Sequence, residues 1–224
     1  MASKISSVEP DAVDKDQRFV GKTTILGAGY GMGAVKFQMQ LSNFGFDMHI
    51  DEARNVIDIY RTTNSAISSL WHNAQEMLKN LCNKSATQLG RGNVLRVDVD
   101  KMAIILPSGL PMYYHDLFFQ TEDNRPQYYY KTRRGPNKIY GGKVVENICQ
   151  AVARCIIGEQ MLRIAKRYKV VLTVHDSIVA CVKDEEVVEA QAYVEECMRW
   201  KPDWADGLPI NCESGTGKSY GDCE

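Results

Sequence analysis

The chain has 224 residues, which suits one large domain or two small ones. Hydrophobic residues make up 44% of it and charged residues 25%, a balance that excludes a disordered or fibrous chain. No run of about 18 apolar residues is present, and residues 1–17 lack the apolar stretch of a signal peptide. We therefore expect a cytoplasmic protein without a membrane partner.

The first part of the chain is predicted to be helical. Residues 1–17 are polar and are expected to form an arm. Helical spacing follows at 18–30 and 33–42, then comes a helix capped by Asp51, and a further helix covers 64–81. The helix after Asp51 carries four residues at core spacing: Ala53, Val56, Ile57 and Tyr60.

The second part of the chain mixes strands and helices. Residues 94–114 have the pattern of two strands around a turn, 142–168 of a long helix, and 170–182 of two strands that meet at a tight turn. A helix capped by Asp184 and a last strand at 208–213 follow. The sequence thus predicts an α+β fold with two domains, a helical one at 1–85 and one at 86–224 with antiparallel strands and packed helices.

Seven cysteines are spread along the chain without a CxxC pair, far in sequence from the four histidines. This spacing argues against a zinc site, and an odd number of cysteines without an export signal is typical of reduced thiols.

A stripe of side chains spaced by four residues follows the first predicted helix. Arg18 and Lys22 are one turn apart, and Leu26 and Tyr30 continue the same face. Two such cations can grip a polyphosphate, and the apolar continuation suits a base or a sugar. An ordinary amphipathic helix with a basic edge explains the same residues. Glycines near its end weaken this helix and predict a close approach by DNA or another chain. They are Gly27, Gly29 and Gly31.

Two later segments also carry candidate chemistry. Residues 124–143 contain six cations, Arg133 and Arg134 among them, with interleaved tyrosines and no acid. Such a segment suits phosphates and bases, or it is a solvated basic loop. Asp176, after His175 at a strand turn, suits a divalent metal, although turn aspartates are common. A Ser-His-Asp hydrolase is disfavoured because adjacent strand residues point to opposite faces.

Three segments in this order resemble the motifs of family A DNA polymerases, the bacterial polymerase I and phage replicative type. The first, RxxxKxxxLxxxYG, resembles motif B, the fingers helix. The resemblance implies that Arg18 and Lys22 contact the triphosphate of a dNTP and that Leu26, where the family usually has an aromatic residue, packs on its base or sugar. It implies that Tyr30 lies where the template base is admitted.

The other two segments resemble the palm of the same family. VHDS resembles motif C, usually VHDE, which implies that Asp176 is a metal ligand and that His175 lies near the primer terminus. Ser177 replaces the usual glutamate. The segment from Tyr140 to Ala151 resembles the YGGK…ENxxQA helix start of phage-type members, which implies that Gln150 touches the minor groove of the primer–template.

No segment resembles motif A, the strand that carries the family's other metal-binding aspartate. The resemblance therefore implies the C-terminal portion of a DNA-directed DNA polymerase, a split or truncated enzyme that needs an N-terminal fragment carrying motif A. The implied partners are a DNA primer–template, dNTPs and two Mg²⁺ ions, in the cytoplasm of a bacterial or phage-infected cell. Lys22 is a further candidate as general acid. The alternative is a non-catalytic DNA-binding or assembly subunit with the polymerase fold; an NTPase is a distant third.

Overall fold

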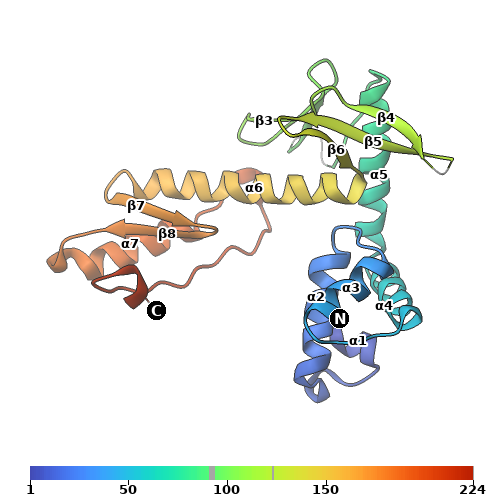
Figure 1. The fold of residues 1–224 in the computed structure, drawn as a ribbon. Helices are drawn as coiled ribbons and strands as arrows, with labels where there is room; N and C mark the ends of the chain where they lie inside the picture. The colour runs from blue at the N-terminus through green and yellow to red at the C-terminus, as the bar shows by residue number, and fades with distance from the viewer. Residues whose placement is uncertain (91–93, 123, 224) are drawn as a thin grey trace. The chain divides into compact units, whose positions relative to one another are not determined.

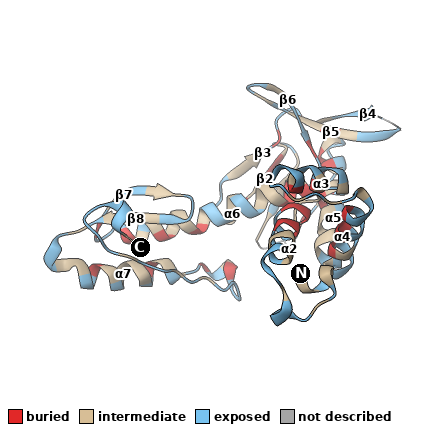
Figure 2. Cartoon of the chain, turned by 60° about the horizontal axis from the view of Figure 1, so that its bottom comes forward, coloured by how far each residue is buried: buried red, intermediate tan, exposed pale blue. Residues whose placement is uncertain are grey.

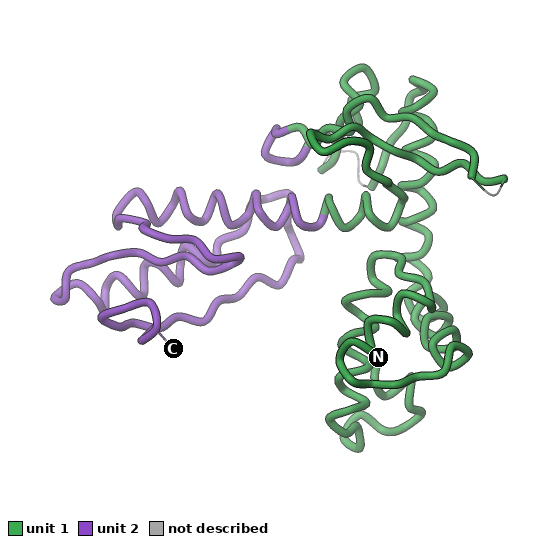
Figure 3. The backbone as a smooth tube through the Cα atoms, in the orientation of Figure 1, with its two compact units in different colours: residues 1–105, 111–148 green, residues 106–110, 149–224 purple. Residues whose placement is uncertain are grey.

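The computed structural model describes residues 1–90, 94–122 and 124–223 (Figure 1). They form two compact units (Figure 3): unit 1 comprises 1–105 and 111–148, and unit 2 comprises 106–110 and 149–224. These units divide the chain elsewhere than at residue 85, because the helix before that residue shares a core with the strands after it. The assignment of 1–85 and 86–224 as fingers and palm portions stays a prediction.

The N-terminal helices of unit 1 are short and closely packed. They are α1 Ala2–Ser6, the 3₁₀ turn η1 Pro10–Ala12, α2 Lys15–Ala28, α3 Ala34–Asn43, α4 Ile50–Thr63 and α5 Ser65–Cys82. The expectation of an arm at 1–17 is wrong for α1, because Met1 and Ile5 pack against the core of the following helices. That core joins the predicted apolar face of α4 to Phe37 and Leu41 of α3.

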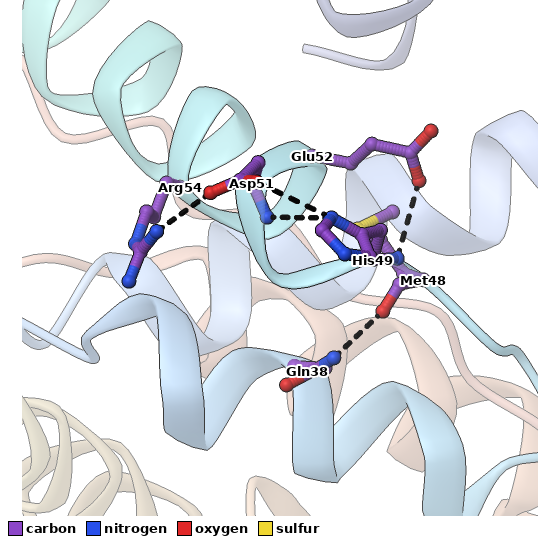
Figure 4. Close-up of polar contacts among 6 residues, drawn as sticks. All are labelled: Gln38, Met48, His49, Asp51, Glu52 and Arg54. Atoms are coloured by element: carbon purple, nitrogen blue, oxygen red, sulfur yellow. Dashed lines mark hydrogen bonds and ion pairs between the residues drawn. The ribbon is translucent and has the colours of Figure 1, made fainter.

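The start of α4 differs from the sequence prediction. His49, not Asp51, is its N-cap: its Nδ1 accepts from the Asp51 amide at 3.3 Å, and its own amide donates to Glu52 Oε2 at 3.3 Å (Figure 4). The Asp51 carboxylate pairs instead with Arg54 at 2.6 Å. Gln38 donates to the Met48 carbonyl at 2.9 Å and so ties α3 to this cap.

Two three-stranded antiparallel sheets complete unit 1. Their strands are β1 Arg96–Asp98, β2 Ala103–Ile105 and β3 Pro111–Tyr113, then β4 Phe118–Glu122, β5 Arg125–Thr132 and β6 Gly135–Ile139. Residues 94–114 thus hold three strands rather than two. The basic segment at 124–143, for which a solvated loop was one of two interpretations, contains the hairpin of β5 and β6. Both sheets bury residues against α5, including Ile104, Tyr128 and Ile139.

The helix α6, Gly141–Ile164, begins in unit 1 and continues into unit 2. Unit 2 adds the hairpin β7 Lys169–Val174 and β8 Ser177–Cys181, the 3₁₀ turn η2 Asp184–Glu186 and α7 Val187–Arg199, and short 3₁₀ turns η3 Asp203–Ala205 and η4 Tyr220–Asp222. The hairpin was predicted. The strand at 208–213 was not found: this segment is irregular, and Cys212 donates to the Glu195 carbonyl of α7. Within the described ranges, no helix has the length and apolar character needed to cross a membrane.

Candidate functional site

The predicted phosphate-binding stripe lies on α2, whose first turn is well capped. Asp14 Oδ1 accepts from the Gln17 amide at 2.8 Å, and the Gln17 side chain accepts from the Asp14 amide. Arg18 and Lys22 follow on the exposed face. Neither forms an ion pair with any described carboxylate, so both cations remain available to an anionic ligand.

A pocket of about 290 Å³ lies beside this stripe. Its lining is Met1, Ala2, Arg18, Gly21, Lys22, Ile25 and Leu26. Leu26 is 59% exposed, and an exposed apolar side chain next to two cations suits a ligand with both phosphate and ring. Gly21 lets α1 form one wall, since a Cβ there would lie 2.7 Å from the Cβ of Ala2.

The far end of α2 is enclosed by other helices. The indole N–H of Trp71, on α5, donates to the Gly29 carbonyl at 3.2 Å. Gly31 has φ +81°, the left-handed region that glycine adopts without strain. The phenol of Tyr60, on α4, lies nearby, and burial, with a smaller effect of Tyr30, raises its pKa. Tyr60 is therefore neutral in the physiological range.

The first residues of α6 contact α5 and the turn that follows α2. Gly141 donates its amide to Gln75 Oε1 on α5 at 2.8 Å, and a Cβ at Gly141 would overlap the carbonyl oxygen of Trp71. A Cβ at Gly142 would lie 2.5 Å from the Tyr30 carbonyl oxygen. We call this contact the glycine junction; its members are Gly29, Tyr30, Gly31, Trp71, Gln75, Gly141 and Gly142.

The glycine junction adds to the explanation offered for the glycines of the first stripe. Segments of the same chain approach closely at this end of α2, and an approach by DNA or another chain stays a prediction. Gly27 is likewise accounted for, because a Cβ there would lie 2.9 Å from the sulfur of Met32. Two segments with separate sequence motifs, one ending at Tyr30 and one beginning at Tyr140, are therefore in direct contact inside unit 1.

Asp176 lies at the tip of the β7–β8 hairpin in unit 2. Val174 pairs with Ser177, which leaves His175 and Asp176 as a two-residue turn. His175 has φ +52°, a conformation that histidine adopts more often than most residues. Both turn side chains are exposed, so the carboxylate of Asp176 points its oxygens to solvent without a packing role.

The chain alone does not make a magnesium site in its described ranges. They hold no group of three or more His, Cys, Asp or Glu side chains that could bind a metal ion. Asp176 offers the carboxylate oxygens that Mg²⁺ prefers, but it is a single protein ligand. It fits the ion only as part of a set completed by other residues.

The remaining predicted residues are all at exposed positions. Arg133 and Arg134 form the turn of the β5–β6 hairpin, where the Thr132 hydroxyl accepts from the Arg134 amide at 3.2 Å. Gln150 is an exposed residue of α6. Unit 1 holds Arg18, Lys22, Leu26, Tyr30, Arg133 and Arg134, and unit 2 holds Gln150, His175 and Asp176.

Sequence reasoning missed two residues of the glycine junction, Trp71 and Gln75. Trp71 was expected on the apolar side of the helix at 64–81 and Gln75 only as a member of it. No local pattern marks a side chain that bonds to a partner 42 or 66 residues away. The strands of the basic hairpin had one partial signal, the run of three tyrosines in β5, a residue type that favours strands.

A model of the family described as DNA polymerase family A matches residues 1–222. The DNA polymerase of Bacillus phage SP02 is 27% identical over 227 residues, covering 95% of this chain and 34% of the phage protein. The POL domain of Pol1 from M. smegmatis, solved in complex with DNA primer-template and dNTP, has a TM-score of 0.55 and 18% identity, covering 95% of this chain and 31% of that one. The chain thus spans about a third of these relatives. The likeness of fold confirms the α+β class.

Proposed function

The chain belongs to DNA polymerase family A, and from this membership we propose that it supplies the dNTP-binding helix and one metal-binding aspartate of a DNA-directed DNA polymerase. The reaction is transfer of a nucleotide from a dNTP to the 3′-hydroxyl of a primer on a DNA template. The observation that carries this proposal is the α2 stripe, where two unpaired cations adjoin an exposed leucine and a pocket of about 290 Å³.

In this proposal α2 binds the incoming nucleotide. Arg18 and Lys22 neutralise the β- and γ-phosphates, which lowers the cost of the negative charge that develops on the leaving pyrophosphate. Leu26 packs on the base or sugar, and Tyr30 adjoins the template base. Lys22 also serves as a general acid that protonates the leaving pyrophosphate.

Asp176 would hold Mg²⁺ together with carboxylates from another segment. Metal ions bound there would supply the activation of the 3′-hydroxyl and the stabilisation of charge on the attacked phosphate. We propose that an N-terminal polymerase segment with a motif A aspartate completes the ligand set. If that segment is a separate polypeptide, the neighbouring upstream reading frame ends in a motif A strand; a frame encoding an unrelated protein contradicts a split gene.

The primer–template is proposed to contact four further residues. Gln150 donates to the minor-groove acceptors that every base pair presents, and His175 lies at the primer terminus. Arg133 and Arg134 contact phosphates. The M. smegmatis relative was solved with these same ligands, DNA primer-template and dNTP, which supports the choice of substrate.

The test is dNTP binding by the 224-residue chain, measured by calorimetry with wild type and Arg18→Ala. A charge-assisted hydrogen bond to phosphate contributes about 1.5–3 kcal/mol, so we expect affinity to fall roughly 10- to 100-fold. Lys36→Ala, which removes an exposed cation from α3, is the matched control and leaves affinity unchanged. Equal affinities for wild type and Arg18→Ala contradict the proposal.

A second assay distinguishes an enzyme from a non-catalytic subunit. The subunit is the second candidate because Ser177 follows Asp176 where the family usually has a glutamate. The chain is added to a polypeptide carrying the rest of a family A polymerase, and primer extension is followed with Mg²⁺ and dNTPs. Extension that requires this chain and its Asp176 supports the polymerase. DNA and dNTP binding without extension supports the subunit.

A further inference from the structure

The β4–β5–β6 sheet has one face in the core and one outside it. Tyr128 and Ile139 lie opposite each other in the register and are 4% and 1% exposed, and Tyr130 packs edge-on against Tyr114. Residues that alternate with them point the other way. We call these the outer sheet face: Phe118, Gln120, Glu122, Arg125, Gln127, Tyr129, Lys131, Pro136 and Lys138.

The outer sheet face is open to solvent. All but three of its residues are exposed, and Figure 2 shows exposed positions along β4 and β6. Phe118, Gln127 and Tyr129 are half-buried by their neighbours. On the opposite face Tyr128 and Ile139 are buried in the core, whereas Phe119 is 53% exposed. The residues of the outer sheet face are not part of that core.

Positive charge dominates this surface. Arg125, Lys131 and Lys138 lie on the outer sheet face, and Arg133 and Arg134 extend it at the hairpin turn. The three arginines form no ion pair with another described residue.

The two lysines are paired, but at the surface. Lys131 meets Asp116 at 3.5 Å, and Lys138 meets Glu122 at 3.6 Å. Exposed pairs of this kind contribute little to stability, so a phosphate can replace the carboxylate at small cost.

An aromatic pair lies in the middle of these cations. The rings of Phe118 and Tyr129 are 5.7 Å apart and inclined by 24°, a stacked arrangement across two strands. The hydroxyl of Tyr129 donates to Glu122, which fixes the ring on the face. Lys138 is the cross-strand neighbour of Tyr129. A ring beside a cation is the unit that holds one nucleotide, with the base on the ring and the phosphate on the cation.

We propose that the outer sheet face binds single-stranded DNA, with bases stacked on Phe118 and Tyr129 and the backbone tracked by Arg125, Lys131 and Lys138. Single strands fit because their base faces are free to stack, whereas those in a duplex are covered by neighbouring pairs. That the strand is the unpaired template rests on the proposed function; the single-strand chemistry does not.

The test measures fluorescence anisotropy of a labelled oligo(dT) and of a blunt duplex of equal length with the full chain. The triple variant Arg125→Ala/Lys131→Ala/Lys138→Ala is compared with Arg54→Ala/Arg61→Ala/Lys79→Ala, which removes three exposed cations elsewhere in unit 1. We expect at least tenfold weaker oligo(dT) binding for the first variant only. Its log K–log salt slope falls by about 2, as expected for three lost phosphate contacts at roughly 0.7 each.

A second variant separates stacking from charge. Tyr129→Leu keeps an apolar strand residue but loses the ring, and we expect roughly tenfold weaker oligo(dT) binding with an unchanged salt slope. Unfolding midpoints establish that the variants are folded. Equal losses for the two triple variants, unchanged binding by Tyr129→Leu, or a stronger effect on the duplex than on oligo(dT) overturns the proposal.

The two proposals can fail separately. The outer-face variants keep wild-type dNTP affinity, and Arg18→Ala keeps wild-type oligo(dT) affinity. If Arg18→Ala leaves dNTP binding intact while the outer-face variants lose oligo(dT), the proposed function falls and the single-strand surface stands. The opposite result removes the surface and keeps the dNTP site.

Discussion

The glycine junction of unit 1 and the β7–β8 turn of unit 2 differ in how closely their residues are packed. At the junction, the backbones of α5, α6 and the turn after α2 approach so closely that Gly141 and Gly142 have no space for a side chain. At the turn, His175 and Asp176 are exposed and make no packing contribution. The junction depends on close packing that leaves no space for side chains, whereas the turn presents two side chains that are free to contact a ligand. Substitutions should therefore cost stability at the junction and activity at the turn.

The largest effect is expected at the turn. Asp176→Asn removes the charge of the proposed metal ligand, and primer extension by the polymerase containing this chain should fall by about 10³-fold or more. The unfolding midpoint should not move, because the side chain is exposed. Asp206→Asn, another exposed carboxylate of unit 2, is the control and keeps activity. If Asp176→Asn retains activity, Asp176 is not the metal ligand that the proposal requires.

At the glycine junction, we expect a substitution to lower the stability of the fold. Gly141→Ala forces a methyl group into the Trp71 carbonyl and disturbs the Gly141–Gln75 hydrogen bond, and we expect a loss of about 3 kcal/mol in the free energy of unfolding by urea. Gly158→Ala, in the same helix, meets no atom within 4 Å and should be neutral or stabilise by about 0.5–1 kcal/mol. Similar unfolding free energies for the two variants would refute the close packing described here.

Stability at alkaline pH should depend on Tyr114, a buried residue in the core of unit 1. Burial raises the pKa of Tyr114 to about 12, although its hydroxyl also accepts from Asn147 at 3.4 Å. The phenol is held neutral in the folded chain, so its contribution is complete below about pH 10 and is lost as the pH rises through 12.

That difference corresponds to about 2–3 kcal/mol. Tyr114→Phe should therefore flatten the fall of unfolding free energy between pH 10 and 12. The measurement is urea unfolding across this range, and an unchanged pH slope in the variant would place the hydroxyl in solvent.

The smallest effect is expected at the open end of α2. Asp14→Ala removes the N-cap one turn before Arg18, which should cost about 1 kcal/mol in thermal unfolding. Asp16→Ala, in the same helical turn but outside the cap, should cost a few tenths of a kcal/mol through the helix dipole. If both changes cost the same, the cap does not anchor this end of α2.

Periodicity was enough to predict most helices and the β7–β8 hairpin. The buried face of α4 and the turn at Asp176 follow directly from local spacing. The short helix α1 could not be predicted, because it depends on the fit between Ala2 and Gly21. The cap of α4 was misassigned by two residues, since Asp51 and His49 both precede the apolar face.

The stripe of side chains on α2 could be predicted from the sequence, but the contacts that other helices make with the end of α2 could not. Spacing by four placed Arg18 and Lys22 on one exposed face of α2. Trp71 and Gln75 were beyond sequence reasoning, because their partners Gly29 and Gly141 are distant in the chain. Long-range hydrogen bonds of this kind leave no periodic trace.

The central claim is that the α2 stripe and Asp176 serve one substrate molecule. The most direct test is a crystal structure of the assembled polymerase with primer–template and a non-hydrolysable dNTP. The account predicts one nucleotide whose β- and γ-phosphates contact Arg18 and Lys22 and whose α-phosphate shares a metal ion with Asp176. A nucleotide held by Arg18 with Asp176 facing a different cavity would contradict it.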